Sequence, residues 1–133
     1  MNEHERRLRE LLPGAEVHLC GSASVPGLDA RDLDLVVLVE DVPTAAELLV
    51  PELPPLHVDQ WRDDWAAFRD PGPPQVDVVL TRRGSLGDKH HRLAWHLLAA
   101  RPDLLDEYRE LKRSPEEYEL RKRQFFERVV ALL

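Results

Sequence analysis

The sequence has a single cysteine, no long apolar run and fewer basic residues than acidic ones (18 Lys and Arg against 25 Asp and Glu), and each of these features excludes a class of protein. A single cysteine, Cys20, excludes an internal disulfide and fits a reducing cytoplasm. No apolar run approaches the roughly 20 residues of a membrane-spanning helix, and the charged opening MNEHERRLRELL has no signal-peptide pattern. A formal net charge of −7 argues against binding nucleic acid mainly through charge. We therefore expect a cytoplasmic protein without membrane or nucleic-acid partners.

Length and patterning indicate one domain. The chain has 133 residues, enough for one hydrophobic core and too few for two. No internal repeat or low-complexity tract interrupts it. Apolar runs typical of strands occupy about 15–81, and helical periodicity follows over about 84–133. The sequence therefore predicts a single α/β (α+β) domain over 1–133, with a strand-rich core and a helical C-terminal part.

Individual elements follow from periodicity and from turn residues. The region 55–70 stays open between a strand and a connecting turn, and DPGPP predicts a tight turn at 70–74. At the last helix, Ser114 and Glu117 have the spacing of a capping box, which predicts that the helix begins at residue 115. Strands are predicted at 15–20, 32–40 and 75–81, and helices at 4–12, 43–50, 85–100, 102–113 and 115–133.

Three aspartates stand out because they interrupt strands that are otherwise apolar. Asp32 and Asp34 alternate with leucines, so both project from the same side at the start of one strand. Asp77 is the lone charge in VDVVL, and neighbouring strands would bring it beside the other two. Clustered carboxylates repel one another, and divalent cations remove that conflict. We therefore predict that Asp32, Asp34 and Asp77 hold Mg²⁺ or Mn²⁺ for phosphoryl chemistry.

A glycine–serine turn precedes these acids. Gly21 and Ser22 follow the predicted strand 15–20 and can offer backbone N–H groups and a hydroxyl to phosphate oxygens. A D-x-D pair alone often only meets water at a strand end. Its combination with a Gly-Ser turn and a later strand aspartate is more specific, and it predicts a site for a nucleoside triphosphate with its metal.

Three cations are further candidates for phosphate binding. Arg31 directly precedes the acidic pair, and it either contacts phosphate or neutralises Asp29. Lys112 and Lys122 fall on the apolar stripes of their helices, where a solvated lysine is not expected. Either they reach an anionic ligand between helices and sheet, or their stems pack while the ammonium groups stay in water.

The histidines and tryptophans favour structural roles. The spacing of His18, Cys20 and the later histidines matches no zinc motif. His90 lies on the apolar stripe of its helix, where it is expected in the core or in a pocket. The tryptophans are expected in the core, with stacking on a nucleobase as the alternative: Trp61, Trp65 and Trp95.

The stretch GSASVPGLDAR resembles the hallmark Gly-Ser-Thr/Ala-Ser/Ala-Val-Pro-Gly-Leu of the GrpB-like family, and ARPDLLDEYRELKRSPEEYELRKRQFFERV is similar to that family's C-terminal end. The likeness covers about 17–130. With its D-x-D and distal aspartate, the chain also resembles the wider nucleotidyltransferase superfamily of polymerase-β-like enzymes. It departs from the narrower family at ARDLDLV, QVDVV and LAWHLL, where other family signatures are usual.

The resemblance implies a mixed sheet flanked by helices and a metal-dependent nucleotidyl transfer. The expected substrate is a nucleoside triphosphate such as ATP, with an unknown small-molecule or protein acceptor. Asp32 and Asp34 would ligate both metals, and Asp77 would ligate one and help to activate the acceptor. Gly21 and Ser22 would position the phosphates.

Three alternatives remain open at this point. The same fold could be a nucleotide- or anion-binding module without turnover. It could be an antitoxin-like transferase that modifies another protein. Finally, the aspartates could be purely structural, either solvated or paired with Arg31 and Arg82.

Overall fold

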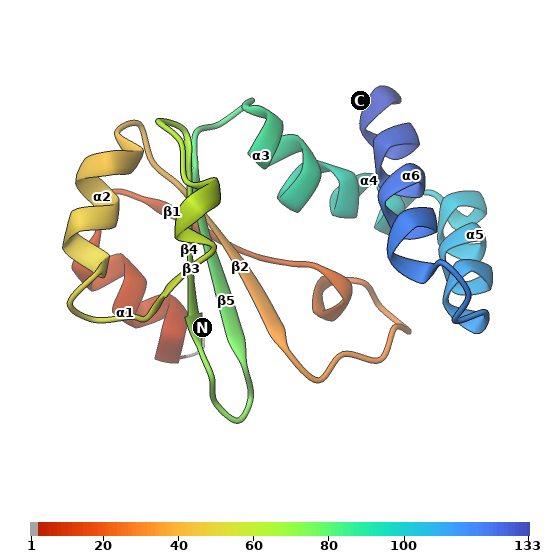
Figure 1. The fold of residues 1–133 in the computed structure, drawn as a ribbon, viewed down its shortest axis with the longest axis horizontal. Helices are drawn as coiled ribbons and strands as arrows, with labels where there is room; N and C mark the ends of the chain where they lie inside the picture. Colours follow the sequence, from red (N-terminus) through yellow and green to blue (C-terminus); the bar gives the residue numbers. More distant parts are fainter. Residues whose placement is uncertain (1–2) are drawn as a thin grey trace.

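The computed structural model describes residues 3–133, which form three layers (Figure 1). A five-stranded sheet separates two N-terminal helices from the helices that follow the last strand. The strands are β1 (Glu16–Cys20), β2 (Leu33–Leu38), β3 (Pro55–Leu56), β4 (Trp65–Asp70) and β5 (Val76–Thr81). The helices are α1 (Glu3–Leu11), α2 (Val42–Leu49), α3 (Leu86–Asp88), α4 (Ala94–Ala100), α5 (Pro102–Arg113) and α6 (Tyr118–Ala131). The predicted α+β class is confirmed.

The sheet is mixed, in the order β1-β2-β5-β4-β3. β2 and β5 run parallel at its centre, whereas the β1–β2, β5–β4 and β4–β3 pairs are antiparallel. The last strand of the chain is therefore inserted between β2 and β4. This central position explains why VDVVLT is almost entirely buried, as its apolar run predicts.

Alternation along the strands decides which side chains meet which layer. In β2, Leu35 and Val37 point into the large core formed with α1 and α2, while Asp34 and Val36 point to the opposite face. β5 divides in the same way, because its residues pair in register with those of β2. Both strand aspartates consequently lie on the face that the C-terminal helices cover.

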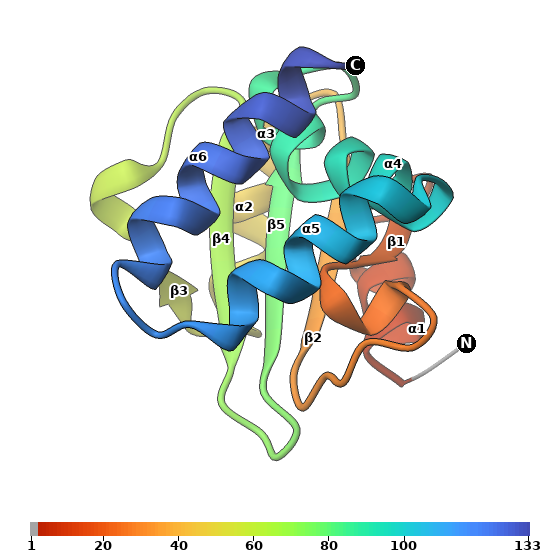
Figure 2. The same ribbon diagram turned by 90° about the vertical axis from the view of Figure 1, so that its right-hand side faces the viewer.

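The C-terminal helices pack mainly on one another. α3, a π turn (Lys89–Leu93) and α4 form one continuous helix. With α5 and α6 it encloses a separate aromatic cluster in which Tyr108 contacts both Phe125 and Phe126. In Figure 2, α5 and α6 cross the face of the sheet obliquely. Because this second core is their own, the helices form a layer of their own beside the sheet.

Some local predictions need correction. Ser114 does not cap the last helix; α6 begins at Tyr118, and Glu117 before it has a left-handed backbone with a φ of 50°. Arg121 donates to the carbonyl groups of Ser114 and Glu116 instead, which holds this connection outside the helix. In the open region, the chain forms β3, a 3-10 turn and β4. Met1 and Asn2 of the predicted domain lie outside the described residues.

Among residues 3–133, no helix combines the length and the apolar character that crossing a bilayer requires.

Candidate functional site

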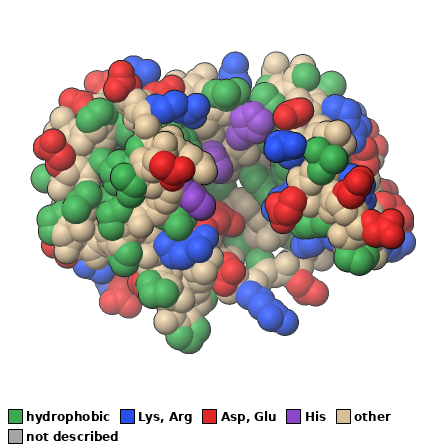
Figure 3. All heavy atoms as spheres, viewed as in Figure 1, with side chains coloured by type: hydrophobic (Ala, Val, Ile, Leu, Met, Phe, Trp, Pro, Cys, Tyr) green, Lys and Arg blue, Asp and Glu red, His purple; other side chains and the backbone are tan. Residues whose placement is uncertain are grey.

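A cleft of about 350 Å³ lies between the sheet and the C-terminal helices. In Figure 3 this face of the molecule is hollowed between the part that holds the sheet and the part that holds α5 and α6, with acidic, basic and histidine side chains around the hollow. Strand residues and the turn after β1 form its floor, and helical residues form its walls. Besides Gly21 and three apolar strand residues, its lining consists of the polar and aromatic residues Asp34, Asp77, His90, His91, Trp95, Glu119, Lys122, Arg123 and Phe126.

Two of the three predicted carboxylates lie side by side on the floor. Asp34 of β2 and Asp77 of β5 are direct register partners in the parallel pair, so their side chains leave the sheet on the same face. Both are partly buried and both line the cleft. The sheet thus joins two acids that lie far apart in the sequence, as their positions in apolar strands predict.

This arrangement disfavours the charged form of Asp34. Burial, followed by the negative charges of Asp77 and Asp32, raises the pKa of the Asp34 carboxyl above its usual value. The positive charge of Lys122 opposes this shift. Among residues 3–133, Asp34 forms no salt bridge. It is therefore a carboxylate that a cation would stabilise.

Gly21 approaches Asp34 so closely that a side chain at position 21 would clash with its carboxylate. Its backbone has a φ of 67° and a ψ of −166°, a region that only glycine adopts readily. A Cβ at this position would lie 2.3 Å from Asp34 Oδ2. Ser22 begins a short 3-10 turn, which Ser24 closes by donating from Oγ to the Gly21 carbonyl at 2.7 Å. Of this predicted phosphate-binding pair, Gly21 lines the cleft.

Asp77 differs from Asp34 because an arginine already neutralises it. Arg69 is its register partner in β4, on the other side of β5. Arg69 donates from Nε to Asp77 Oδ1 at 2.7 Å and from Nη2 to Oδ2 at 2.9 Å. Sequence analysis missed Arg69. The predicted turn at 70–74 was the only sequence signal for Arg69, because a hairpin pairs the residues before its turn with the residues after the turn.

The other predicted residues lie at the edge of the site or outside it. Asp32 precedes β2 and is exposed, although its charge still acts on Asp34. Arg31 is exposed as well. Lys112 is exposed on α5, and its Nζ lies 5.4 Å from the centre of the Tyr108 ring rather than in the cleft lining.

Lys122 is the predicted lysine that the fold brings to the site. It lies on α6, which passes over the sheet, and it lines the cleft opposite Asp34. Its Nζ also lies 5.9 Å from the centre of the Tyr118 ring. The next residue, Arg123, lines the cleft too, and sequence analysis did not single it out. The cleft therefore has an acidic floor, and its α6 wall carries the cations Lys122 and Arg123 beside the acidic Glu119.

Two histidines connect this cleft to a second cavity of about 470 Å³. His90 and His91 line both spaces, and Trp61 and Trp65 form walls of the second. Both histidines belong to the π turn, a helical irregularity that often occurs at functional sites. Burial lowers the pKa of His91 to about 4, so its imidazole is neutral at pH 7. The predicted pocket position of His90 agrees with this placement.

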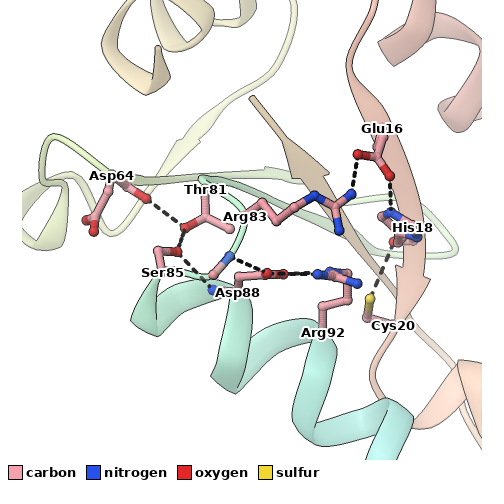
Figure 4. A network of polar contacts seen from close by, with 10 residues as sticks. Glu16, His18, Cys20, Asp64, Thr81, Arg83, Ser85, Asp88 and Arg92 are labelled. Carbon is pink, nitrogen blue, oxygen red and sulfur yellow. Dashed lines mark hydrogen bonds and ion pairs between the residues drawn. The ribbon is translucent and has the colours of Figure 1, made fainter. Parts of the chain in front are cut away.

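A buried polar network fixes the start of the helix that carries these histidines (Figure 4). Asp88 is fully buried and receives Arg92 Nε at 2.5 Å and Nη2 at 2.8 Å, together with the Gly84 amide at 2.8 Å. Ser85 caps the helix through the Asp88 amide, and its hydroxyl contacts that of Thr81 at 2.7 Å. The network therefore ties the end of β5 to the helix above the cleft.

The oxygen donors of the floor fit a magnesium ion that arrives with its ligand. In proteins Mg²⁺ is usually held by one or two carboxylates plus substrate phosphates rather than by a cage of protein ligands. Asp34 supplies such a carboxylate, and Asp32 is the next acid towards solvent. Within residues 3–133, no group of three or more His, Cys, Asp or Glu side chains is arranged to hold an ion unaided.

Comparisons with known proteins agree with this architecture. The family described as GrpB protein matches residues 1–131 of the chain. The crystal structure of the conserved protein GrpB from Enterococcus faecalis is similar at a TM-score of 0.74 and 18% sequence identity, over 97% of this chain and 89% of that one. No curated protein matches the chain.

Proposed function

The chain belongs to the GrpB protein family, which has a nucleotidyltransferase-like fold, and from this premise we propose that its cleft binds a nucleoside triphosphate with Mg²⁺ or Mn²⁺. ATP is the first candidate for that triphosphate. The reaction that we propose transfers the nucleoside monophosphate to a hydroxyl of an acceptor, either a small molecule or a protein.

The observation that carries this proposal is the carboxylate of Asp34, which forms no salt bridge with any of residues 3–133. It lies on the cleft floor beside a second acid, its pKa is raised, and Lys122 faces it from the opposite wall. A buried acid in this position is unfavourable unless a cation joins it. A triphosphate that carries a divalent cation matches both sides of the cleft, because its metal meets the acids of the floor and its phosphates meet Lys122 and Arg123 on α6.

Each residue then has a defined task. Asp34, with Asp32, would hold the divalent cation, which when bound offsets the negative charge of the phosphates. Lys122 and Arg123 would contact phosphate oxygens from α6. Gly21 lets the chain pass close to Asp34, so that the ligand meets backbone there instead of a side chain.

The transfer needs no reactant other than the nucleoside triphosphate and the acceptor. The acceptor oxygen bonds to the α-phosphorus, the bond from that phosphorus to the bridging oxygen breaks, pyrophosphate leaves, and the acceptor proton passes to water. Each Asp77 oxygen receives one hydrogen bond from Arg69 and has a lone pair left over. Asp77 would use it to orient the acceptor hydroxyl.

A binding module without turnover is the second candidate, and one observation favours it. The two hydrogen bonds from Arg69 engage both Asp77 oxygens in an ion pair, so this carboxylate is not free to serve as a general base for the acceptor. In such a module the nucleotide and its metal would bind through Asp34 and Lys122, and no pyrophosphate would form.

Calorimetric titration of ATP, with and without Mg²⁺, tests the binding. We expect Mg²⁺ to strengthen ATP binding to the unaltered protein at least about tenfold, which corresponds to 1.4 kcal/mol, and Asp34→Asn to abolish that gain. Asp106→Asn removes the same charge from an exposed position on α5 and should behave like the unaltered protein. Equal ATP binding by the unaltered protein and Asp34→Asn in both conditions would contradict the proposal.

Product analysis separates the remaining possibilities. Pyrophosphate release with a panel of hydroxylated acceptors identifies small-molecule transfer, and label from α-labelled ATP on another polypeptide identifies protein modification. Metal-dependent binding with neither product identifies the binding module.

A further inference from the structure

The ion pair between Arg69 and Asp77 lies beside Asp34, so its charges affect which cations the cleft can bind. The two residues face each other across the β4–β5 pair, on the face of the sheet that bears Asp34. Both Asp77 oxygens receive a hydrogen bond, at 2.7 and 2.9 Å, in the parallel geometry that suits a guanidinium and a carboxylate. The negative charges of Asp32 and Asp34 also help to raise the pKa of Arg69, after its hydrogen bond to Asp77.

A fixed guanidinium changes how many metal ions this site can hold. Sites with two metals keep the ions roughly 3.5–4 Å apart between shared carboxylates, whose oxygens must face the ions. Here both Asp77 oxygens face Arg69, which is charged at every physiological pH. A second divalent ion at Asp77 would have to displace this arginine, or lie beside it and be repelled by it.

We propose that the Arg69 side chain takes the place of a second metal ion, so that the cleft binds one divalent cation per nucleotide. This inference rests on the proposed function. The cation is held by Asp34 with Asp32 and the phosphates, and Arg69 supplies the other positive charge. Arg69 Nη1, which makes no hydrogen bond to the part of the chain that the structure describes, is then a donor for a phosphate or acceptor oxygen.

Arg69 differs from a metal ion in one measurable respect: a chelator cannot remove it. Removal of the arginine, in contrast, frees Asp77 to act as a second ligand beside Asp34. The number of bound ions should therefore rise when Arg69 is replaced by a neutral residue. A lysine at the same position keeps the positive charge and should keep the original number.

Counting of bound Mn²⁺ tests the proposal. The protein is saturated with α,β-methylene-ATP and Mn²⁺, and bound Mn²⁺ per bound nucleotide is measured by electron paramagnetic resonance. We expect one ion in the unaltered protein, one in Arg69→Lys and two in Arg69→Gln. In the double variant Arg69→Gln/Asp77→Asn the freed carboxylate is also gone, and one ion is expected.

The unaltered protein alone can overturn the inference. Two bound ions there would refute it, whether or not Arg69→Gln folds, while leaving the proposed function intact. One ion in an Arg69→Gln variant with a native circular dichroism spectrum would refute it as well. If the unaltered protein binds neither Mn²⁺ nor the nucleotide, the proposed function itself fails.

Discussion

Because Gly21 lies directly against Asp34, the addition of one methyl group at position 21 tests the glycine–serine turn. In Gly21→Ala the new Cβ would lie 2.3 Å from Asp34 Oδ2 and 3.2 Å from Asp34 Cβ. Either the carboxylate rotates away or the turn moves. We expect both the stability of the fold and the position of the acid to suffer.

The magnitude follows from two contributions. The backbone at Gly21, with a φ of 67°, costs a residue with a Cβ about 1–3 kcal/mol. Displacement of the Asp34 side chain from its rotamer adds about 0.5–1.5 kcal/mol. The total loss in the free energy of unfolding should be about 1.5–4.5 kcal/mol. Gly84→Ala is the matched control, because Gly84 has a φ of 79° and nothing lies within 4 Å of the added Cβ. It should lose only about 1–2 kcal/mol.

Equilibrium unfolding in urea measures these differences. The Gly21→Ala and Asp34→Ala changes should be non-additive by about 1 kcal/mol in a double-mutant cycle, because removal of the carboxylate also removes the clash. The reasoning fails if Gly21→Ala costs no more than Gly84→Ala and the cycle shows no coupling.

Three further predictions concern the surroundings of the cleft. Asp88→Asn should lower the free energy of unfolding, measured by urea denaturation, by about 3–5 kcal/mol, because it leaves the Arg92 charge buried without its partner. A loss below about 1 kcal/mol would contradict this. Cys20 is fully buried and its pKa is raised to about 12, so iodoacetamide should label it at pH 8 only after unfolding. Because the pKa of His91 is lowered to about 4, its neutral form stabilises the fold above pH 6.5, and up to about 3 kcal/mol is lost as the pH falls towards 4. His91→Gln should remove that part of the pH dependence, and an unchanged profile would refute the assignment.

Sequence periodicity was sufficient to assign the strand aspartates to one face. A lone acid in an apolar run such as VDVVL projects away from its neighbours, and the same rule applies to Asp34. The pairing of strands was not contained in any local pattern. Asp77 has Asp34 on one side and Arg69 on the other only because β5 is inserted between β2 and β4.

Helical stripes were a weaker guide. Lys112 and Lys122 fall on apolar stripes alike, yet α6 brings only Lys122 into the cleft lining. Both helices cross the face of the sheet, and which of the two lysines reaches the cleft depends on how the aromatic cluster packs, which no single helix encodes. The capping box did not form, because the chain turns at Glu117, which has a φ of 50°, and the helix begins only at Tyr118.

The parallel pairing of β2 with β5 has a consequence for biogenesis. Asp34 leaves the ribosome well before Asp77, and α2, β3 and β4 must be made before the two can meet. Pairing of two strands so far apart in the sequence costs conformational entropy, and helices or hairpins that form earlier cannot take its place. A nascent or truncated chain that ends before β5 therefore lacks the paired acids altogether, and capacity for ligand would arise only once the central strand has docked.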